Sequence, residues 1–158
     1  MSAAAEITRA KAPPGHEPQR VPRVSDDGLV ILDPWWGTIQ PHQLHPETPT
    51  WGELEVIRHL ESGGRLVDTR QTEYVNASGT IPGSLVIPWE ETGDHLATFD
   101  PGRVTVLFCN GPQCAATPRA IKILLEAGVP AAALAYYRGG IQDWLGLGLP
   151  VATARPSN

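Results

Sequence analysis

The stretch from Val104 to Gly128, VTVLFCNGPQCAATPRAIKILLEAG, constrains the fold of this chain more than any other. It begins with five consecutive residues, 104–108, that are apolar or β-branched, and such a short run is typical of a buried parallel strand. Cys109 follows at the carboxyl end of this strand. Asn110, Gly111 and Pro112 then end the strand, since glycine and proline favour a turn.

A helix is predicted to begin at Thr117, whose hydroxyl suits the N-cap, with Pro118 at the first helical position. Gly128 and the proline that follows at position 130 are predicted to end it. The apolar residues between them are dense enough for a mostly buried helix: Ala120, Ile121, Ile123, Leu124, Leu125 and Ala127.

The arrangement of Cys109 before a helix N-terminus has a chemical consequence. Unpaired backbone N–H groups and the positive end of the helix dipole would face the sulfur and stabilise a thiolate. The pattern therefore predicts that the pKa of Cys109 is lowered into the range of roughly 3.5–7.5. A buried structural cysteine is the alternative. We favour a functional thiol, because ligands bind at strand ends in open α/β sheets.

The rest of the chain alternates predicted strands with predicted helices. Thr50 and Glu53 have the spacing of a capping box, which predicts a helix from Thr50 with a buried stripe of Leu54, Val56, Ile57 and Leu60. Strands are predicted over residues 28–33, 65–68, 84–87 and 131–137, and short helices over residues 71–76 and 141–147. This order predicts an α/β fold with a central parallel sheet and helices on both faces.

From about Thr50 to Val151 the chain resembles a single rhodanese-like domain. Three blocks carry the resemblance: LVDTR (66–70) with GTIPGSLVIP (79–88), the Cys109 loop with its helix, and YYRGGIQDWLGLGLPV (136–151). The resemblance implies a three-layer α/β fold. It also implies a sulfurtransferase that moves sulfane sulfur from a donor to a thiophilic acceptor through a persulfide on Cys109, with no cofactor.

The resemblance also implies roles for residues around Cys109. Asp68 and Arg70 would support the loop. Apart from the resemblance, Arg119 and Arg138 are basic residues near the loop in the sequence and are candidates for loop support or for charge that holds the substrate. The anion would be bound by the backbone of the loop, which consists of Asn110, Gly111, Pro112, Gln113, Ala115, Ala116 and Thr117.

The chain departs from the family pattern at two places. The loop carries no arginine, and Thr80 stands where the family has histidine. Because arginine binds dianions through paired hydrogen bonds, thiosulfate is less favoured as the donor. Polysulfide and low-molecular-weight persulfide remain open beside it.

Cys114 lies five positions after Cys109, and two interpretations of it stay open. It is either a resolving thiol that attacks a Cys109 persulfide or a small side chain packed under the loop. The pair also defines an alternative function, a non-enzymatic rhodanese-like binding module or a thiol redox switch that uses both cysteines.

Domain boundaries follow from composition. We predict one rhodanese-like domain over residues 28–152, a disordered proline-rich arm over residues 1–27 and a tail over residues 153–158. Trp35 and Trp36 are predicted to fold back over the core, and an exposed tryptophan pair, with a protein partner or homodimer, is the alternative.

Charge and cysteine content narrow the classes of partner and location. The net charge of -5 with scattered basic residues argues against nucleic acid. Two cysteines without a long apolar segment favour a cytoplasmic protein with no membrane association. No metal site is predicted, because His42, His45, His59 and His95 lack ligand spacing. The expected partners are a small sulfur donor and a thiol acceptor.

Overall fold

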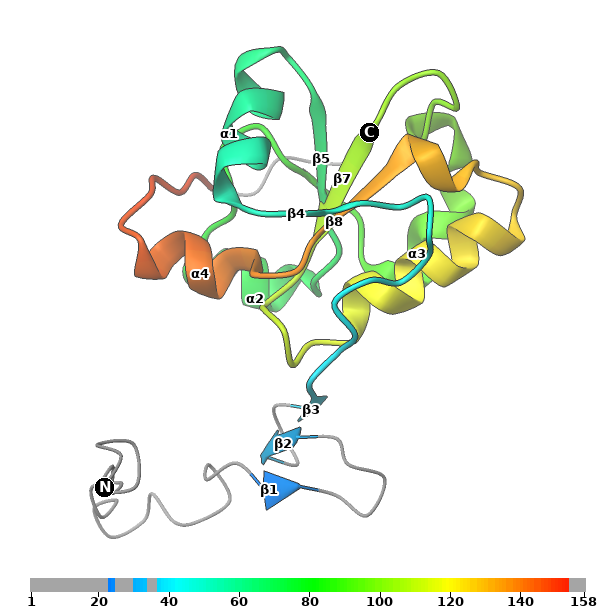
Figure 1. Cartoon of the computed structure of the whole chain (residues 1–158). Helices are drawn as coiled ribbons and strands as arrows, with labels where there is room; N and C mark the ends of the chain where they lie inside the picture. The colour runs from blue at the N-terminus through cyan, green and yellow to red at the C-terminus, as the bar shows by residue number, and fades with distance from the viewer. Residues whose placement is uncertain (1–22, 25–29, 34–36, 154–158) are drawn as a thin grey trace, which may run out of the picture.

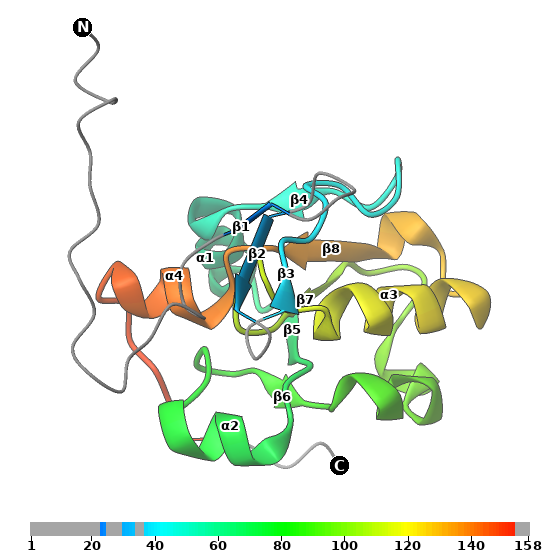
Figure 2. The same cartoon turned by 90° about the horizontal axis from the view of Figure 1, so that it is seen from below.

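The computed structural model describes residues 23–24, 30–33 and 37–153. Its centre is a sheet of five parallel strands in the order β4-β8-β7-β5-β6 (Figure 2). This arrangement confirms the predicted parallel sheet. The strands are β4 Thr50–Trp51, β5 Arg65–Asp68, β6 Leu85–Val86, β7 Thr105–Phe108 and β8 Leu134–Tyr137.

Helices cover both faces of this sheet, as predicted (Figure 1). Helices α1 (Glu53–Glu61) and α4 (Gly140–Gly146) lie on one face, and α3 (Ala116–Glu126) lies on the other. The remaining helices are α2 (Thr72–Ser78) and the 3₁₀ helices η3 (Trp89–Asp94), η4 (Leu96–Thr98) and η5 (Ala131–Ala133).

Strand β7 divides the core into two apolar clusters. Its side chains alternate between the faces: Val106 and Phe108 pack in the cluster with α1 and α4, while Leu107 packs in the cluster with α3. All four residues of β7 are buried, which explains why its sequence is a continuous apolar and β-branched run rather than an alternating one.

The predicted capping box at Thr50 is wrong. Thr50 belongs to β4, where it pairs with Tyr136, and its hydroxyl donates to His42 O. Helix α1 begins at Glu53 after Gly52 and has no side-chain cap. Leu54, which we placed in the buried stripe, is 65% exposed, whereas Val56 is fully buried.

Several element boundaries also differ from the prediction. The expected strand over residues 131–137 is a strand only from Leu134, because a 3₁₀ turn precedes it. Helix α2 and strand β6 lie within one or two residues of their predicted positions.

A second sheet precedes the main one. It is antiparallel and consists of β1 (Arg23–Val24), β2 (Val30–Asp33) and β3 (Gly37–Thr38). Strand β1 falls inside the range predicted to be disordered. The rest of the predicted arm, the tryptophan pair Trp35 and Trp36, and the tail beyond Thr153 lie outside the described residues. Within the described ranges, none of the helices has the length and apolar character needed to cross a bilayer.

Candidate active site

Cys109 directly follows β7 at the carboxyl edge of the sheet. Because Leu107 faces α3 and side chains alternate along a strand, the Cys109 side chain also faces α3. It is only 2% exposed. Thr69 follows β5 in the same way and lies beside it, with its backbone N–H bonded to Phe108 O at 2.9 Å. The strand ends therefore bring a thiol and a hydroxyl together beneath the first turn of α3.

Both cysteines are free thiols, and they lie in contact. A turn closed by the Cys114 N–H and Gly111 O, 3.0 Å apart, brings Cys114 back over Cys109. The Cys109 thiol lies 3.6 Å from Cys114 O, which can accept from it, and it also has hydrogen-bond contacts with the Cys114 sulfur and with Thr117. The structure thus assembles the two cysteines that the sequence placed five residues apart.

The predicted low pKa falls on Cys114 rather than on Cys109. Burial, followed by the hydrogen bond to Cys114, raises the pKa of Cys109 well above its ordinary value, although Thr117 opposes this. Donation from the Cys109 thiol lowers the pKa of Cys114 to about 6 against the effect of burial, helped by the N–H groups of Ala116 and Asn110 and the charge of Arg70. The shifts therefore have the opposite order to the prediction: the pKa of Cys114 is lowered and the pKa of Cys109 is raised.

Thr117 does not cap α3. The helix begins at Ala116 after Ala115, without a side-chain cap. The Thr117 hydroxyl instead lies 2.9 Å from the Thr69 hydroxyl, which donates to Phe108 O at 3.0 Å, and both threonines are fully buried. Thr117 therefore ties the first turn of α3 to the strand ends and contacts the Cys109 sulfur.

Helix α4 holds the other side of the loop. The N–H groups of Ile141 and Gln142 donate to Cys109 O and Asn110 O at 3.0 and 2.9 Å. Gly140 adopts a φ of 64°, and a Cβ there would lie 2.8 Å from the carbonyl carbon of Asn110 and closer still to Cys109 O. Only glycine allows this approach. Gly140 therefore provides the backbone room that the loop needs beside α4.

Asp68 and Arg70 form a fully buried ion pair, with 2.7 Å between Arg70 Nη2 and Asp68 Oδ2. Asp68 also accepts from Thr80 Oγ1 at 2.7 Å. Arg70 donates further to Ser78 Oγ and Gly79 O. These hydrogen bonds hold the end of β5 against the C-terminus of α2. The effect of Arg70 on the thiols is through its charge, which lowers the pKa of Cys114.

The predicted cations occupy different places. Arg138 donates from Nε and Nη2 to Gln40 O at 3.2 and 2.7 Å, and Gln40 N–H donates to Pro112 O at 2.7 Å. Gln40 therefore bridges Arg138 and the loop, a contact that no sequence signal predicted. Arg119 is exposed and lies over the Trp89 ring, 5.1 Å from its centroid.

The other predicted loop residues line the turn. Gln113 is 5% exposed, and Pro112 offers its carbonyl to Gln40. Sequence reasoning missed Thr69, Gln40 and Tyr136, the last of which is described below. Among the described residues, no group of three or more His, Cys, Asp or Glu side chains is placed to hold a metal ion.

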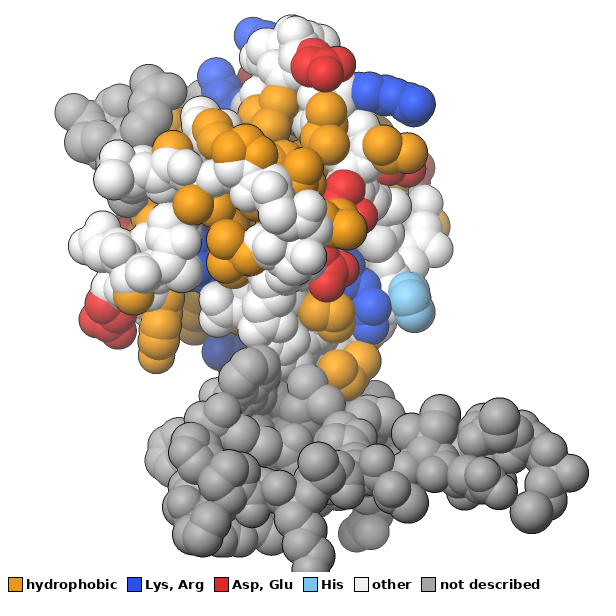
Figure 3. Space-filling view, turned by 90° about the vertical axis from the view of Figure 1, so that its left-hand side faces the viewer, with side chains coloured by type: hydrophobic (Ala, Val, Ile, Leu, Met, Phe, Trp, Pro, Cys, Tyr) orange, Lys and Arg blue, Asp and Glu red, His pale blue; other side chains and the backbone are white. Residues whose placement is uncertain are grey.

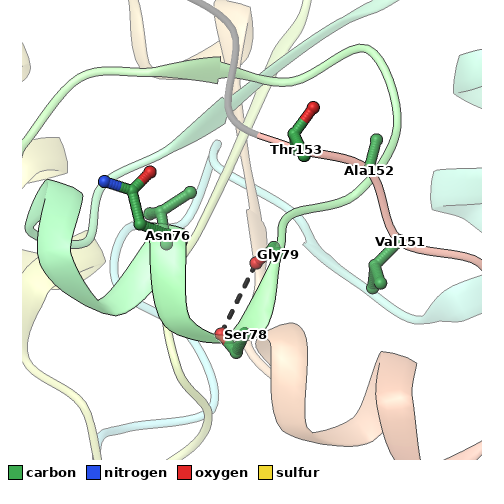
Figure 4. A pocket seen from close by; sticks show the side chains of 7 residues that line it. Asn76, Ser78, Gly79, Val151, Ala152 and Thr153 are labelled. Atoms are coloured by element: carbon green, nitrogen blue, oxygen red, sulfur yellow. Dashed lines mark hydrogen bonds between the residues drawn. The ribbon is translucent and has the colours of Figure 1, made fainter.

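Of the hollows in the described part of the chain, two lie beside α2 and α1, away from the thiols. One, of about 270 Å³, lies between the end of α2 and residues 151–153 (Figure 4), and none of its lining residues is charged or a cysteine. The other, of about 660 Å³, lies between α1, Pro82 and Leu149, on the face where Figure 3 shows apolar side chains gathered. Neither includes a group that could carry sulfur.

Comparisons with known proteins agree with the fold. The profile of the rhodanese-like domain matches residues 54–147. The solved human single-domain sulfurtransferase TSTD1 is 28% identical, with a TM-score of 0.52 over 63% of this chain and 96% of that protein. A thiosulfate sulfurtransferase from Pseudomonas aeruginosa is 24% identical, with a TM-score of 0.56 over 69% of this chain and 21% of its own length.

One relative is a transcriptional regulator. The HTH-type transcriptional regulator Rv0324 of Mycobacterium tuberculosis is 37% identical over 103 residues. These residues are 65% of this chain and 44% of the regulator. The chain thus spans less than half the length of that relative.

Proposed function

Because the chain belongs to the rhodanese-like domain family, we propose that it is a sulfurtransferase that carries sulfane sulfur as a persulfide on Cys109. The observation that supports this most is the place of Cys109: it follows the central strand, beneath the first turn of α3, with a second thiol in contact. The likeness to the human single-domain sulfurtransferase adds support.

The thiol pair suggests how the nucleophile forms. Cys114, with its pKa of about 6, is a thiolate at neutral pH and accepts the hydrogen of Cys109. In the proposed first step Cys114 takes this proton while Cys109 Sγ attacks the outer sulfur of the donor. The donor S–S bond breaks and its electron pair leaves with the donor remainder, which is sulfite when thiosulfate is used. An acceptor thiolate then attacks the outer sulfur and releases Cys109.

The arginines near the thiols are engaged by protein groups, so neither is placed to bind the sulfonate-like end of thiosulfate through paired hydrogen bonds. The Arg70 guanidinium donates its hydrogen bonds to Asp68, Ser78 and Gly79. The Arg138 guanidinium donates to Gln40. Backbone N–H groups and the charge of these arginines remain to stabilise an anion. We therefore propose polysulfide or a low-molecular-weight persulfide ahead of thiosulfate, with a thiol acceptor, in a compartment such as the cytoplasm that keeps both cysteines reduced.

Intact mass after incubation with thiosulfate, and separately with glutathione persulfide, tests the proposal. We expect wild type to gain one sulfur, Cys114→Ser to gain it more slowly because the thiolate base is lost, and Cys109→Ser to gain none. Thiocyanate should be released from the loaded protein on addition of cyanide. Full turnover in Cys109→Ser would refute the role of Cys109. The donor that loads the protein identifies the substrate class.

A thiol switch is the second candidate, favoured by the contact between the two cysteines and by the likeness to a transcriptional regulator. Peroxide would take two electrons from the thiols, form the Cys109–Cys114 disulfide and be reduced to water. This candidate predicts rapid disulfide formation with peroxide and no sulfur gain with any donor.

A further inference from the structure

Tyr136 holds a polar atom without a partner in the core. Among the described residues, Tyr136 Oη and Ser84 Oγ are the buried side-chain oxygens that make no hydrogen bond. Buried polar groups are nearly always paired, so each exception needs an explanation. Ser84 precedes β6, at the amino edge of the sheet. Tyr136 is 1% exposed and lies one residue from the carboxyl end of β8.

The sheet places Tyr136 beside Cys109. Strand β8 pairs with β7, and Tyr136 is the register partner of Leu107, two residues before Cys109. Tyr136 and Leu107 belong to the same cluster on the α3 face. Since side chains alternate along a strand, Cys109 lies on this face too, as the diagonal neighbour of Tyr136.

The electrostatics of Tyr136 agree with this position. Burial, followed by the negative charge that Cys109 carries when it is ionised, raises the pKa of Tyr136 above its ordinary value. Arg138 opposes this shift and Cys114 adds to it. The phenol therefore keeps its hydrogen at neutral pH. It is a donor whose pKa responds to the charges of both cysteines, yet its hydroxyl has no hydrogen-bond acceptor in the resting protein.

We infer that Tyr136 donates its hydrogen bond to the outer sulfur that Cys109 carries, an inference that rests on the proposed sulfur transfer. An S–S bond of about 2.05 Å would place a new acceptor beyond Cys109 Sγ, where the resting thiol offers none. The hydroxyl is thus unpaired in the free protein and paired in the persulfide, so it stabilises the loaded state selectively.

The role is that of a hydrogen-bond donor and involves no proton transfer. Cys109 gains the sulfur as the donor S–S bond breaks, and the negative charge of the persulfide rests on the outer sulfur, where Tyr136 Oη–H stabilises it. When the acceptor thiolate attacks that sulfur, the Cys109 S–S bond breaks and its electron pair returns to Sγ. Tyr136 remains a phenol throughout.

The test compares Tyr136→Phe with Tyr137→Phe. Tyr137 is the adjacent residue on the opposite face, and its hydroxyl donates to Glu53 Oε1 at 3.0 Å. We expect Tyr136→Phe to have a Tm no lower than wild type, because it loses an unpaired hydroxyl, while its rate of persulfide formation falls about tenfold to hundredfold. Tyr137→Phe should show the reverse, a lower Tm with unchanged loading.

The outcomes separate failure of the Tyr136 inference from failure of the sulfurtransferase proposal. Loading of wild type together with equal loading of Tyr136→Phe would overturn the inference alone. A lower Tm in Tyr136→Phe would also overturn it, since the hydroxyl would then have a partner in the resting protein. No sulfur gain in wild type with thiosulfate or glutathione persulfide would overturn the sulfurtransferase proposal and this inference with it.

Discussion

Gly140 lies directly against the carbonyl of Cys109. The next N–H, of Ile141, donates to Cys109 O at 3.0 Å, and any Cβ at position 140 would overlap that oxygen. Helix α4 and the thiol loop are therefore packed backbone to backbone, and the loop position depends on this glycine.

Gly140→Ala should destabilise the protein and abolish sulfur loading. Alanine at a φ of 64° costs about 1–2 kcal/mol, and the overlap with two backbone carbonyls adds to this. Gly128→Ala is the matched control, because Gly128 has a φ of 95° but nothing within 4 Å of its Cβ position. Urea unfolding should show a larger loss for Gly140→Ala. Equal losses would mean that the approach to Cys109 is unimportant.

Arg138→Ala should release Gln40 from the loop. The two hydrogen bonds from Arg138 hold Gln40 O while Gln40 N–H donates to Pro112 O. Without Arg138 we expect hydrogen exchange of the Gln40 amide to accelerate at least about tenfold. Arg119→Ala, which removes a cation over Trp89, should leave this amide unchanged. Unchanged exchange in Arg138→Ala would show that Gln40 is held by other contacts.

The rate of alkylation by iodoacetamide should follow the ionisation of the Cys114 thiol as the pH rises. Only the thiolate reacts, so the rate should rise through a pH of about 6 and level off at higher pH, with modification mapped to Cys114 by tandem mass spectrometry. Since the Cys109 thiol is the largest cause of this lowered pKa, Cys109→Ala should shift the midpoint upward, toward about 8.5. If the alkylation of Cys109, rather than that of Cys114, had a pH midpoint near 6, the low pKa would belong to Cys109, as the sequence predicts.

Arg70→Ala should cost about 3–5 kcal/mol of unfolding free energy, because it leaves Asp68 charged and buried. Arg103→Ala removes an exposed arginine and should change stability by less than about 0.5 kcal/mol. The measurement is urea unfolding at neutral pH. A cost below about 1 kcal/mol for Arg70→Ala would mean that Thr80 and Arg70 N–H satisfy Asp68 without the guanidinium.

The fold could be predicted because its signals are local. The run 104–108, the turn residues after Cys109 and the apolar stripe of α3 lie within one stretch, and each acts on its neighbours in sequence. The capping box at Thr50 failed for the opposite reason: pairing with β8, more than eighty residues later, overrides the local preference.

The site could be predicted in part. Cys109, Cys114 and the Asp68–Arg70 pair stand in recognisable motifs. Arg138 and Gln40 are 98 residues apart, and Thr69 and Thr117 are 48 apart, so only the folded chain brings them together. The sequence predicted a lowered pKa for Cys109, whereas its pKa is raised. The two main causes, burial of the thiol and its hydrogen bond to Cys114, arise from tertiary packing.

Strand β4 has a practical consequence for anyone shortening this chain. It lies outside the match at residues 54–147, yet Thr50 and Trp51 pair with β8, and Pro49 O accepts from Tyr136 N–H at 2.9 Å. A fragment cut at residue 54 would turn β8, an entirely buried apolar strand, into a bare sheet edge. An unpaired edge of this kind can pair with the same strand of another copy and cause aggregation. The smallest fragment that stays monomeric should therefore include β4 and Gln40, whose N–H donates to Pro112 O in the loop.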